Sequence, residues 1–232
     1  MCIRDRYPKT QEKPPFQTYG EIMSKIERGN LGEVEQKELW DCLFLSRDEI
    51  DELLKHVCEN ALHDFIYPMF VMAAHTGARR SELIRSQLVD FGSDFVTIRE
   101  KKRRRGKLST RRVPLSPSLA TAIKEWEEVH PGGSSTFCLT DIMYSSKTRE
   151  RAMPITPSEA NKHFNRVLLN SKWSVIPGWH CFRHSFCSNC AMKGIDQRLI
   201  DAWVGHTTEE MRKRYRHLFP NHESTSLNIV FG

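Results

Sequence analysis

The stretch that decides the local fold reads Thr76-Gly77-Ala78-Arg79-Arg80-Ser81-Glu82-Leu83. It follows an apolar run, and the pattern predicts a helix over residues 61–75 that ends at Gly77, because glycine tolerates the left-handed backbone that closes helices. A second helix is expected from about Arg79 to about Ser86. Arg79 therefore follows a glycine-broken helix, where a rigid backbone can aim its guanidinium inward. Taken alone, a surface arginine at a helix N-terminus explains the stretch better.

Helical patterns continue on both sides of this stretch. Upstream, Ser46 and Glu49 form a capping box that opens a helix to about residue 57. Downstream, caps and apolar periodicity predict helices over about 116–129, 156–170, 180–193 and 196–204, and a helix through Tyr215 that is capped by Thr207 or Thr208.

One β-hairpin is expected, from strands over residues 95–98 and 112–115 with Gly106 in the loop. The fold class is therefore mostly α with a small antiparallel β-sheet (α+β). A solvated charge run is the ordinary explanation of the basic segment in this hairpin, but on a hairpin tip it could enter a groove or reach a phosphate. The segment holds nine basic residues and one acid in fourteen positions, and the basic residues are Arg99, Lys101, Lys102, Arg103, Arg104, Arg105, Lys107, Arg111 and Arg112.

The composition is that of one folded domain with appendages, at 232 residues with 39% hydrophobic and 28% charged residues. The longest apolar run, residues 65–74, is too short to cross a bilayer, so we expect no membrane contact and a cytoplasmic location. The seven cysteines lack the spacing of a disulfide framework and are expected to be reduced. The net charge is +6 although residues 21–60 carry eleven acids and five bases, so the rest of the chain is strongly basic and suits a polyanionic partner.

Two further patterns carry chemistry. His180 and Arg183 share one face of a helix, and a proton-transfer group beside a permanent cation suits phosphate chemistry, although His-x-x-Arg is common by itself. Gly205-His206 ends a short helix, and Tyr215 follows nine residues after the histidine. Because its neighbours are basic, we expect Tyr215 not to be a core tyrosine but to present its hydroxyl to a basic surface; stacking on a base or on arginines is the alternative. Those neighbours are Arg212, Lys213, Arg214 and Arg216.

A zinc site is a rival interpretation of the segment around His180. Cys181, His184, Cys187 and Cys190 include one Cys-x-x-Cys step. Structural zinc needs a closed set of ligands that converge on one point. Cys187 and Cys190 share a helix face that Cys181 does not obviously join, and the sequence has no second Cys-x-x-Cys pair. Buried thiols on a core-facing helix are therefore favoured, and no metal is expected.

The order of these signals resembles the tyrosine recombinase, or phage integrase, family over residues 46–220. That order is an arginine, a lysine on a β-hairpin, His-x-x-Arg, Gly-His and a tyrosine. The pattern Thr-Gly-x-Arg-x-Ser-Glu-Leu around Arg79, the 23-residue step from Arg183 to His206 and the nine-residue step to Tyr215 all fit the family. The resemblance implies a site-specific DNA recombinase, an integrase, that integrates or excises a mobile element through a 3′-phosphotyrosyl intermediate.

The resemblance also implies a role for each site residue. Arg79 and Arg183 would clamp the phosphate oxygens with their planar forks, and His206 would donate a further hydrogen bond to the same oxygens. Tyr215 would attack the phosphorus. His180 would manage the tyrosine proton as a general base or an orienting group.

A hairpin lysine, Lys101 or Lys102, would protonate the departing 5′ oxygen; the first fits the count along the strand and the second an alternative register. Glu82 would orient the first arginine or its helix. The hairpin cations from Arg99 to Arg112 would contact DNA. No metal or other cofactor is implied, because the arginines and the lysine supply the positive charge.

The expected organisation has four parts. Residues 1–13 are a non-native or disordered N-terminus, residues 14–45 a linker with one short helix from a missing N-terminal DNA-binding domain, residues 46–220 the catalytic domain, and residues 221–232 a tail that docks on a neighbouring subunit or on its own chain. The implied partner is double-stranded DNA, on which the chain forms a homo-oligomer, a tetramer. The implied setting is bacterial or phage-derived and nucleoid-associated. Two alternatives remain: type IB topoisomerase-like strand swivelling, and a non-catalytic DNA-binding module.

Overall fold

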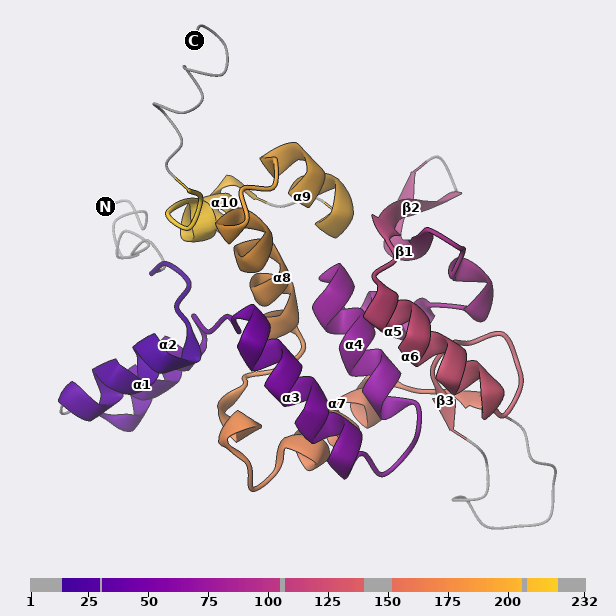
Figure 1. The fold of residues 1–232 in the computed structure, drawn as a ribbon, viewed down its shortest axis with the longest axis horizontal. Coiled ribbons are helices and arrows are strands. Elements are labelled where there is room, and N and C mark those ends of the chain that lie inside the picture. The colour runs from indigo at the N-terminus through magenta and orange to yellow at the C-terminus, as the bar shows by residue number, and fades with distance from the viewer. Residues whose placement is uncertain (1–13, 30, 105–106, 140–151, 206–207, 221–232) are drawn as a thin grey trace, which may run out of the picture.

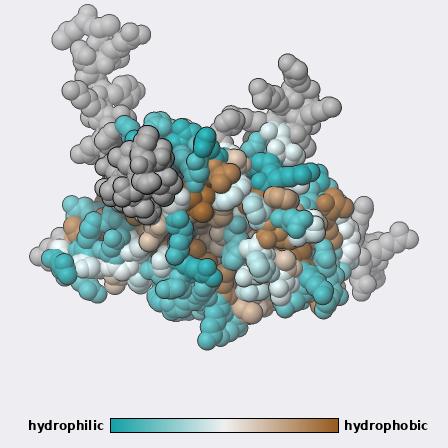
Figure 2. Space-filling view, turned by 45° about the horizontal axis from the view of Figure 1, so that its top comes forward, coloured by the Kyte–Doolittle hydropathy of each residue, from teal (hydrophilic) through white to brown (hydrophobic). Residues whose placement is uncertain are grey.

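The computed structural model describes residues 14–29, 31–104, 107–139, 152–205 and 208–220, and for residues 101–104 and 107–108 it describes the backbone alone. Helices make up most of this part of the chain, and two antiparallel strand pairs complete it (Figure 1). The expected class, mostly α with a small antiparallel sheet, is confirmed. Polar residues cover most of the face shown in Figure 2, with smaller apolar areas between them. None of the described helices has the length and apolarity needed to cross a membrane.

The elements follow one another along the chain without repeats. In order they are α1 (Tyr19–Arg28), α2 (Glu33–Trp40), α3 (Arg47–Asn60), α4 (Ile66–Thr76), α5 (Arg80–Arg85), the 3₁₀ turn η2 (Leu88–Asp90), β1 (Phe95–Arg104), β2 (Lys107–Pro114), α6 (Pro117–Glu128), β3 (Cys138–Leu139), β4 (Met153–Pro154), α7 (Pro157–Leu168), the 3₁₀ turn η4 (Lys172–Val175), α8 (His180–Met192), α9 (Gln197–Val204) and α10 (Glu209–Arg216).

Local caps set several helix starts where the sequence predicts them. The Ser46 hydroxyl accepts a hydrogen bond from the Glu49 amide, and the Glu49 carboxylate accepts one from the Ser46 amide, which is the predicted capping box of α3. Thr156 caps α7 and Thr208 caps α10. The start of α4 was predicted wrongly at residue 61: α3 runs on to Asn60, and the chain has to turn before α4 can begin at Ile66.

Helix α4 lies at the centre of the bundle and packs against α3, α6 and α8 (Figure 1). Nine of its eleven residues are buried, so it is apolar nearly all round. It ends at Gly77, whose φ of 61° is the left-handed conformation predicted there. A Cβ at Gly77 would lie 3.1 Å from atoms of Phe186 and Val204. The absence of a side chain at this position therefore also allows the close packing against α8 and α9.

The hairpin is longer than the predicted strands. β1 and β2 pair antiparallel from Phe95 opposite Pro114 to Arg104 opposite Lys107, with a register shift between Arg99 and Arg103. Val96, Ile98 and Val113 are buried on its inner face, which anchors the base of the hairpin to the core. The predicted loop residue Gly106 lies outside the described residues.

The segment before α3 differs from the predicted linker with one short helix. It contains two helices, α1 and α2, that stand to one side of the bundle (Figure 1). The chain enters and leaves this pair side by side, because Gln17 and Leu43 form a parallel backbone bridge. Ile22 is the buried residue of α1, whereas α2 buries none, so the pair adds little to the core.

We predict that Gly77→Ala lowers the free energy of unfolding by about 1–3 kcal/mol, the usual cost of a left-handed non-glycine residue. Urea unfolding measures this change. Gly20→Ala is the matched control, since Gly20 lies within α1 and a Cβ there meets nothing within 4 Å. The control should keep or slightly raise the stability, and equal stability of the two variants would contradict the prediction.

Candidate active site

A cleft of about 1060 Å³ opens where α5, the start of α8 and the start of α10 face the end of α2. Its walls are rich in cations and imidazoles, with two carboxylates on the α2 side. Such a concentration of positive charge suits an anionic ligand. The charged and imidazole lining residues are Glu38, Asp41, Arg79, Arg80, His180, Arg183, His184 and Arg214.

Arg79 is aimed into the cleft by the first turn of α5. It is the N-cap residue of that helix, and its amide and its Nη1 both donate to the Glu82 carboxylate, at 2.9 Å each. Glu82 is 2% exposed. Burial alone would raise the pKa of Glu82, but hydrogen bonds and charge from Arg111 and Arg79 hold that pKa below its ordinary value. Glu82 therefore stays ionised at neutral pH and accepts hydrogen bonds from both the backbone and the side chain of Arg79.

Arg111 belongs to the support of the site rather than to a free DNA-binding surface. Its side chain is 7% exposed and donates from Nη2 to Glu82 at 2.7 Å and from Nη1 to Glu100 at 3.2 Å. Its Nε donates to the carbonyl of Trp203 at 2.6 Å. The DNA contact predicted for Arg111 would require these hydrogen bonds to open, because all three nitrogens donate to groups inside the protein. Sequence reasoning missed this, since its partners come from α5, β1 and α9.

The position after Trp203 and Val204 is equally constrained. Gly205 has a φ of 76°, and a Cβ there would lie 2.6 Å from Glu100 Oε1. The Glu100 side chain of β1 therefore packs directly against Gly205, which follows α9. His206, the next residue and a predicted site residue, lies outside the described residues.

Arg183 is the most buried cation of the cleft, at 6% exposure. Its Nη1 donates to the carbonyl of Gly77 at 3.0 Å, so the glycine-ended helix α4 holds it in place. Among the described residues its Nη2 has no hydrogen-bond partner. Burial and the nearby charge of Arg79 lower its pKa to about 10, which leaves it cationic at neutral pH. A buried donor without an acceptor is costly, and an anion in the cleft would satisfy it.

His180 lines the same cleft from the first turn of α8. Burial and the charges of Arg183 and Arg79 lower its pKa from 6.5. At neutral pH the imidazole is therefore held neutral and can accept a proton. The structure thus brings together three predicted residues, Arg79, His180 and Arg183, around one space.

Tyr215 does not line this cleft, and the expectation that it is not a core tyrosine is wrong. It is 1% exposed and packs in an apolar cluster with Phe16, Phe44 and Val204. Its hydroxyl accepts a hydrogen bond from Gln197 Nε2 at 3.0 Å. The sequence does hold a signal for this burial, because the positions four before, three after and four after Tyr215 are apolar and pack in the same cluster: Met211, Leu218 and Phe219.

The predicted hairpin cations separate into three groups. Arg99 is engaged, with Nε and Nη2 donating to the Asp90 carboxylate at 2.7–2.9 Å, so its predicted DNA contact would require this pair to open. Arg112 is exposed. Both candidate lysines, Lys101 and Lys102, lie in the strand segment with the register shift, so strand alternation does not choose between them. The side chains of Lys101, Lys102, Arg103, Arg104, Arg105 and Lys107 lie outside the described part.

The cysteines of α8 behave as buried thiols. Burial raises the pKa of Cys181 to about 12 and that of Cys187 to about 11. His184 stacks on Phe16, with ring centroids 4.3 Å apart. In the described part of the chain, no three His, Cys, Asp or Glu side chains are grouped closely enough to hold a metal ion.

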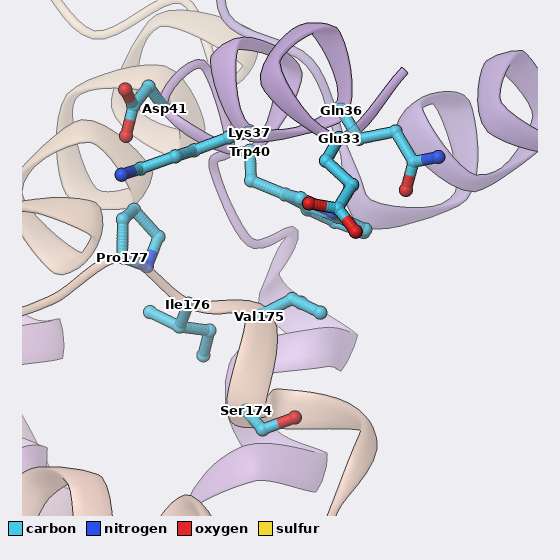
Figure 3. A pocket seen from close by; sticks show the side chains of 9 residues that line it. All are labelled: Glu33, Gln36, Lys37, Trp40, Asp41, Ser174, Val175, Ile176 and Pro177. Atoms are coloured by element: carbon cyan, nitrogen blue, oxygen red, sulfur yellow. The ribbon is translucent and has the colours of Figure 1, made fainter. Parts of the chain in front are cut away.

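A smaller cavity of about 430 Å³ lies between α2 and the segment that follows α7. Figure 3 shows Glu33, Lys37 and Trp40 on one side and residues 174–177 on the other. Its charged lining residues are Glu33, Lys37 and Asp41, so it lacks the excess of cations found in the larger cleft. The larger cleft is therefore the candidate active site.

Tyrosine recombinases and phage integrases resemble this chain in sequence. Tyrosine recombinase XerA of Pyrococcus furiosus is 26% identical over 180 residues, which are 77% of this chain and 58% of XerA. The integrase of Haemophilus phage HP1 is 27% identical over 191 residues, which are 80% of this chain and 47% of that integrase. The chain thus spans about half the length of these relatives.

Solved structures share the fold. The crystal structure of XerA recombinase covers 92% of this chain with a TM-score of 0.58 at 16% identity, and the match spans 81% of that structure. The catalytic domain of bacteriophage HP1 integrase covers 80% of the chain with a TM-score of 0.52 at 22% identity, and 93% of that domain is matched. The profile of the Phage integrase family matches residues 43–222. With more than half of its length matched, the chain belongs to the phage integrase family.

Proposed function

We propose that the protein is a tyrosine site-specific recombinase, which cuts and rejoins DNA through a 3′-phosphotyrosyl intermediate to integrate or excise a mobile element. One observation carries the proposal. Arg79, His180 and Arg183 converge on one cleft, and Arg183 holds a buried donor that an anion would satisfy. Membership of the phage integrase family supports the same reaction.

The proposal gives each predicted site residue a role in the reaction. Arg79 and Arg183 hold the non-bridging oxygens of the scissile phosphate and stabilise the charge that develops on them. The Tyr215 oxygen forms a bond to phosphorus and loses its proton to neutral His180, while the bond from phosphorus to the 5′ oxygen breaks. Lys101 or Lys102 gives its proton to that 5′ oxygen. Reversal of these steps rejoins a strand.

Two further residues complete the proposed site. His206, the residue after Gly205, donates a hydrogen bond to the phosphate. Tyr215 has to leave its buried position and its hydrogen bond from Gln197 before it can attack, because it does not line the cleft. Binding of DNA would thus be coupled to a movement of α10.

We also propose double-stranded DNA as the partner and a tetramer as the working assembly. XerH recombinase bound to its difH substrate shares this fold, with a TM-score of 0.57 at 18% identity. A lambda integrase tetramer bound to a Holliday junction also matches, with a TM-score of 0.50 at 12% identity. These likenesses support the proposal through the fold. A cytoplasmic, nucleoid-associated location and a role of residues 14–45 as a linker to a DNA-binding domain belong to the same proposal.

The first test is covalent trapping on a pool of nicked randomised duplexes, in EDTA and low salt. We predict an SDS-resistant protein–DNA adduct that Tyr215→Phe abolishes while DNA binding persists, because the variant lacks the attacking oxygen. Tyr67→Phe, in the buried helix α4, is the control and should form the adduct. An adduct in Tyr215→Phe would contradict the assignment of the nucleophile. Binding without any adduct in the parent protein would instead indicate a DNA-binding module.

The pH dependence of adduct formation tests His180. Its pKa is lowered, so the neutral base is present above that value and is lost as the pH falls through it. We predict a rate that rises with pH through a midpoint below 6.5. His180→Gln should flatten this rise and lower the rate. An unchanged profile in His180→Gln would exclude the histidine as the group that titrates.

Glu82→Gln tests the support of the cleft. Loss of the carboxylate removes the charge that orients Arg79 and Arg111, so we predict a fall in the rate of adduct formation of about 10- to 100-fold. The DNA concentration that gives half-maximal rate should change much less. Glu125→Gln, on the exposed face of α6, is the matched control. An equal effect on rate and on DNA affinity would show that Glu82 supports binding rather than positioning.

A further inference from the structure

We propose that the segment Pro14–Gln17, here called the N-terminal clamp, holds Tyr215 in its buried position, with Phe16 and Arg214 as the positioning residues. The proposal rests on the assignment of Tyr215 as the nucleophile. The clamp precedes the region that matches the family, which begins at residue 43. It joins the nucleophile helix to the part of the chain that comes before the catalytic domain.

Phe16 is the centre of the clamp. Its ring stacks on His184 of α8, with centroids 4.3 Å apart and an interplanar angle of 28°. The guanidinium carbon of Arg214 lies 3.8 Å from the centroid of the same ring. Phe16 is 1% exposed. The Phe16 ring thus makes a stacking contact and a cation–π contact, and an aliphatic side chain could make neither.

Arg214, which directly precedes Tyr215, is also bound to the backbone of the clamp. Its carbonyl accepts a hydrogen bond from the Phe16 amide at 3.1 Å, and its Nε donates to the Pro14 carbonyl at 2.9 Å. Its residue exposure is 8%. Two hydrogen bonds and a ring contact therefore attach one residue of α10 to the clamp, so the two cannot move independently.

The clamp is in turn fixed to α8 through the chain that enters α3. The Gln17 amide donates to the Cys42 carbonyl at 3.0 Å, and the Phe44 amide donates to the Gln17 carbonyl at 2.9 Å. The Leu45 amide donates to Ser185 Oγ at 2.8 Å, which anchors this pair of segments on α8. In Figure 1 the indigo chain begins near α10 before it forms α1.

These contacts affect Tyr215 because Phe16 of the clamp and Tyr215 of α10 belong to one apolar cluster. Phe16, Phe44 and Tyr215 belong to that cluster, together with Cys187, Ala191, Ile200 and Val204. Removing the aromatic ring of Phe16 would loosen the wall against which α10 packs. A displacement of the chain upstream of Pro14 would be transmitted to α10 through the contacts of the clamp with Arg214, and it would release Tyr215 toward the cleft.

Hydrogen exchange of the whole chain, without DNA, tests the clamp. Phe16→Leu keeps an apolar side chain but removes both ring contacts, and Arg214→Lys keeps the charge but removes the guanidinium fork. We expect amide exchange in α10 to become about tenfold faster in each, and nitration of Tyr215 by tetranitromethane to rise with it, while exchange in α4 stays unchanged. The double variant should add little, because both changes break one connection. Tyr19→Leu, which alters the aromatic contacts of α1 with Trp40 and Trp173, is the matched control.

The outcomes separate this proposal from the proposed function. Unchanged α10 exchange and unchanged Tyr215 nitration in both variants, with α4 intact, would overturn the clamp whatever the nucleophile is. In the trapping assay, Phe16→Leu should raise the rate of adduct formation at saturating DNA, because the tyrosine is released more often. A lower rate together with faster α10 exchange would also overturn it. An adduct in Tyr215→Phe would overturn the nucleophile while leaving the exchange result standing.

Discussion

Burial of the Glu82 carboxylate between Arg79 and Arg111 connects the parts of the structure on which the site depends. A buried carboxylate is tolerated only when it is paired and hydrogen-bonded, and here it accepts from both arginines. Through Arg111 the connection extends to Glu100 of β1 and to the Trp203 carbonyl at the end of α9. One carboxylate thus ties α5, the hairpin and α9 into a frame, and the proposed phosphate-binding arginine is held by that frame rather than by the surface around it.

The cleft itself is electrostatically unbalanced. Arg79, Arg80 and Arg183 face it, and the burial that places Arg183 there lowers its pKa to about 10. Mutual repulsion among these cations destabilises the folded protein when no ligand is bound. A phosphate diester would offset the repulsion and satisfy the buried guanidinium at once, which is the arrangement expected of a site that stabilises developing negative charge.

Much of the fold follows from short-range signals in the sequence, whereas the errors lie in long-range contacts. Ser46, Thr156 and Thr208 cap helices through their own neighbours, so their helices were predictable. The spacing of the family motif predicted that Arg79, His180 and Arg183 would meet. The commitment of Arg111 to Glu82 could not be predicted, because the pair is separated by 29 residues and lies on different elements. The prediction that Tyr215 is exposed was wrong. Its adjacent cations favoured exposure, but the apolar residues at helical spacing around it pack into the same cluster.

The contact between Gly205 and Glu100 limits how the hairpin can be altered in any attempt to change the proposed DNA preference. A side chain at position 205 would bring its Cβ within 2.6 Å of Glu100 Oε1, so the Glu100 carboxylate would have to shift, and the left-handed φ of 76° would add backbone strain. Changes to strand β1 near Glu100 therefore have to preserve its fit against Gly205. Residues 100 and 205 would have to be redesigned as a pair, with Arg111 included because it pairs with Glu100 and lies close to the same glycine. A hairpin grafted in its place would first need to satisfy this fit.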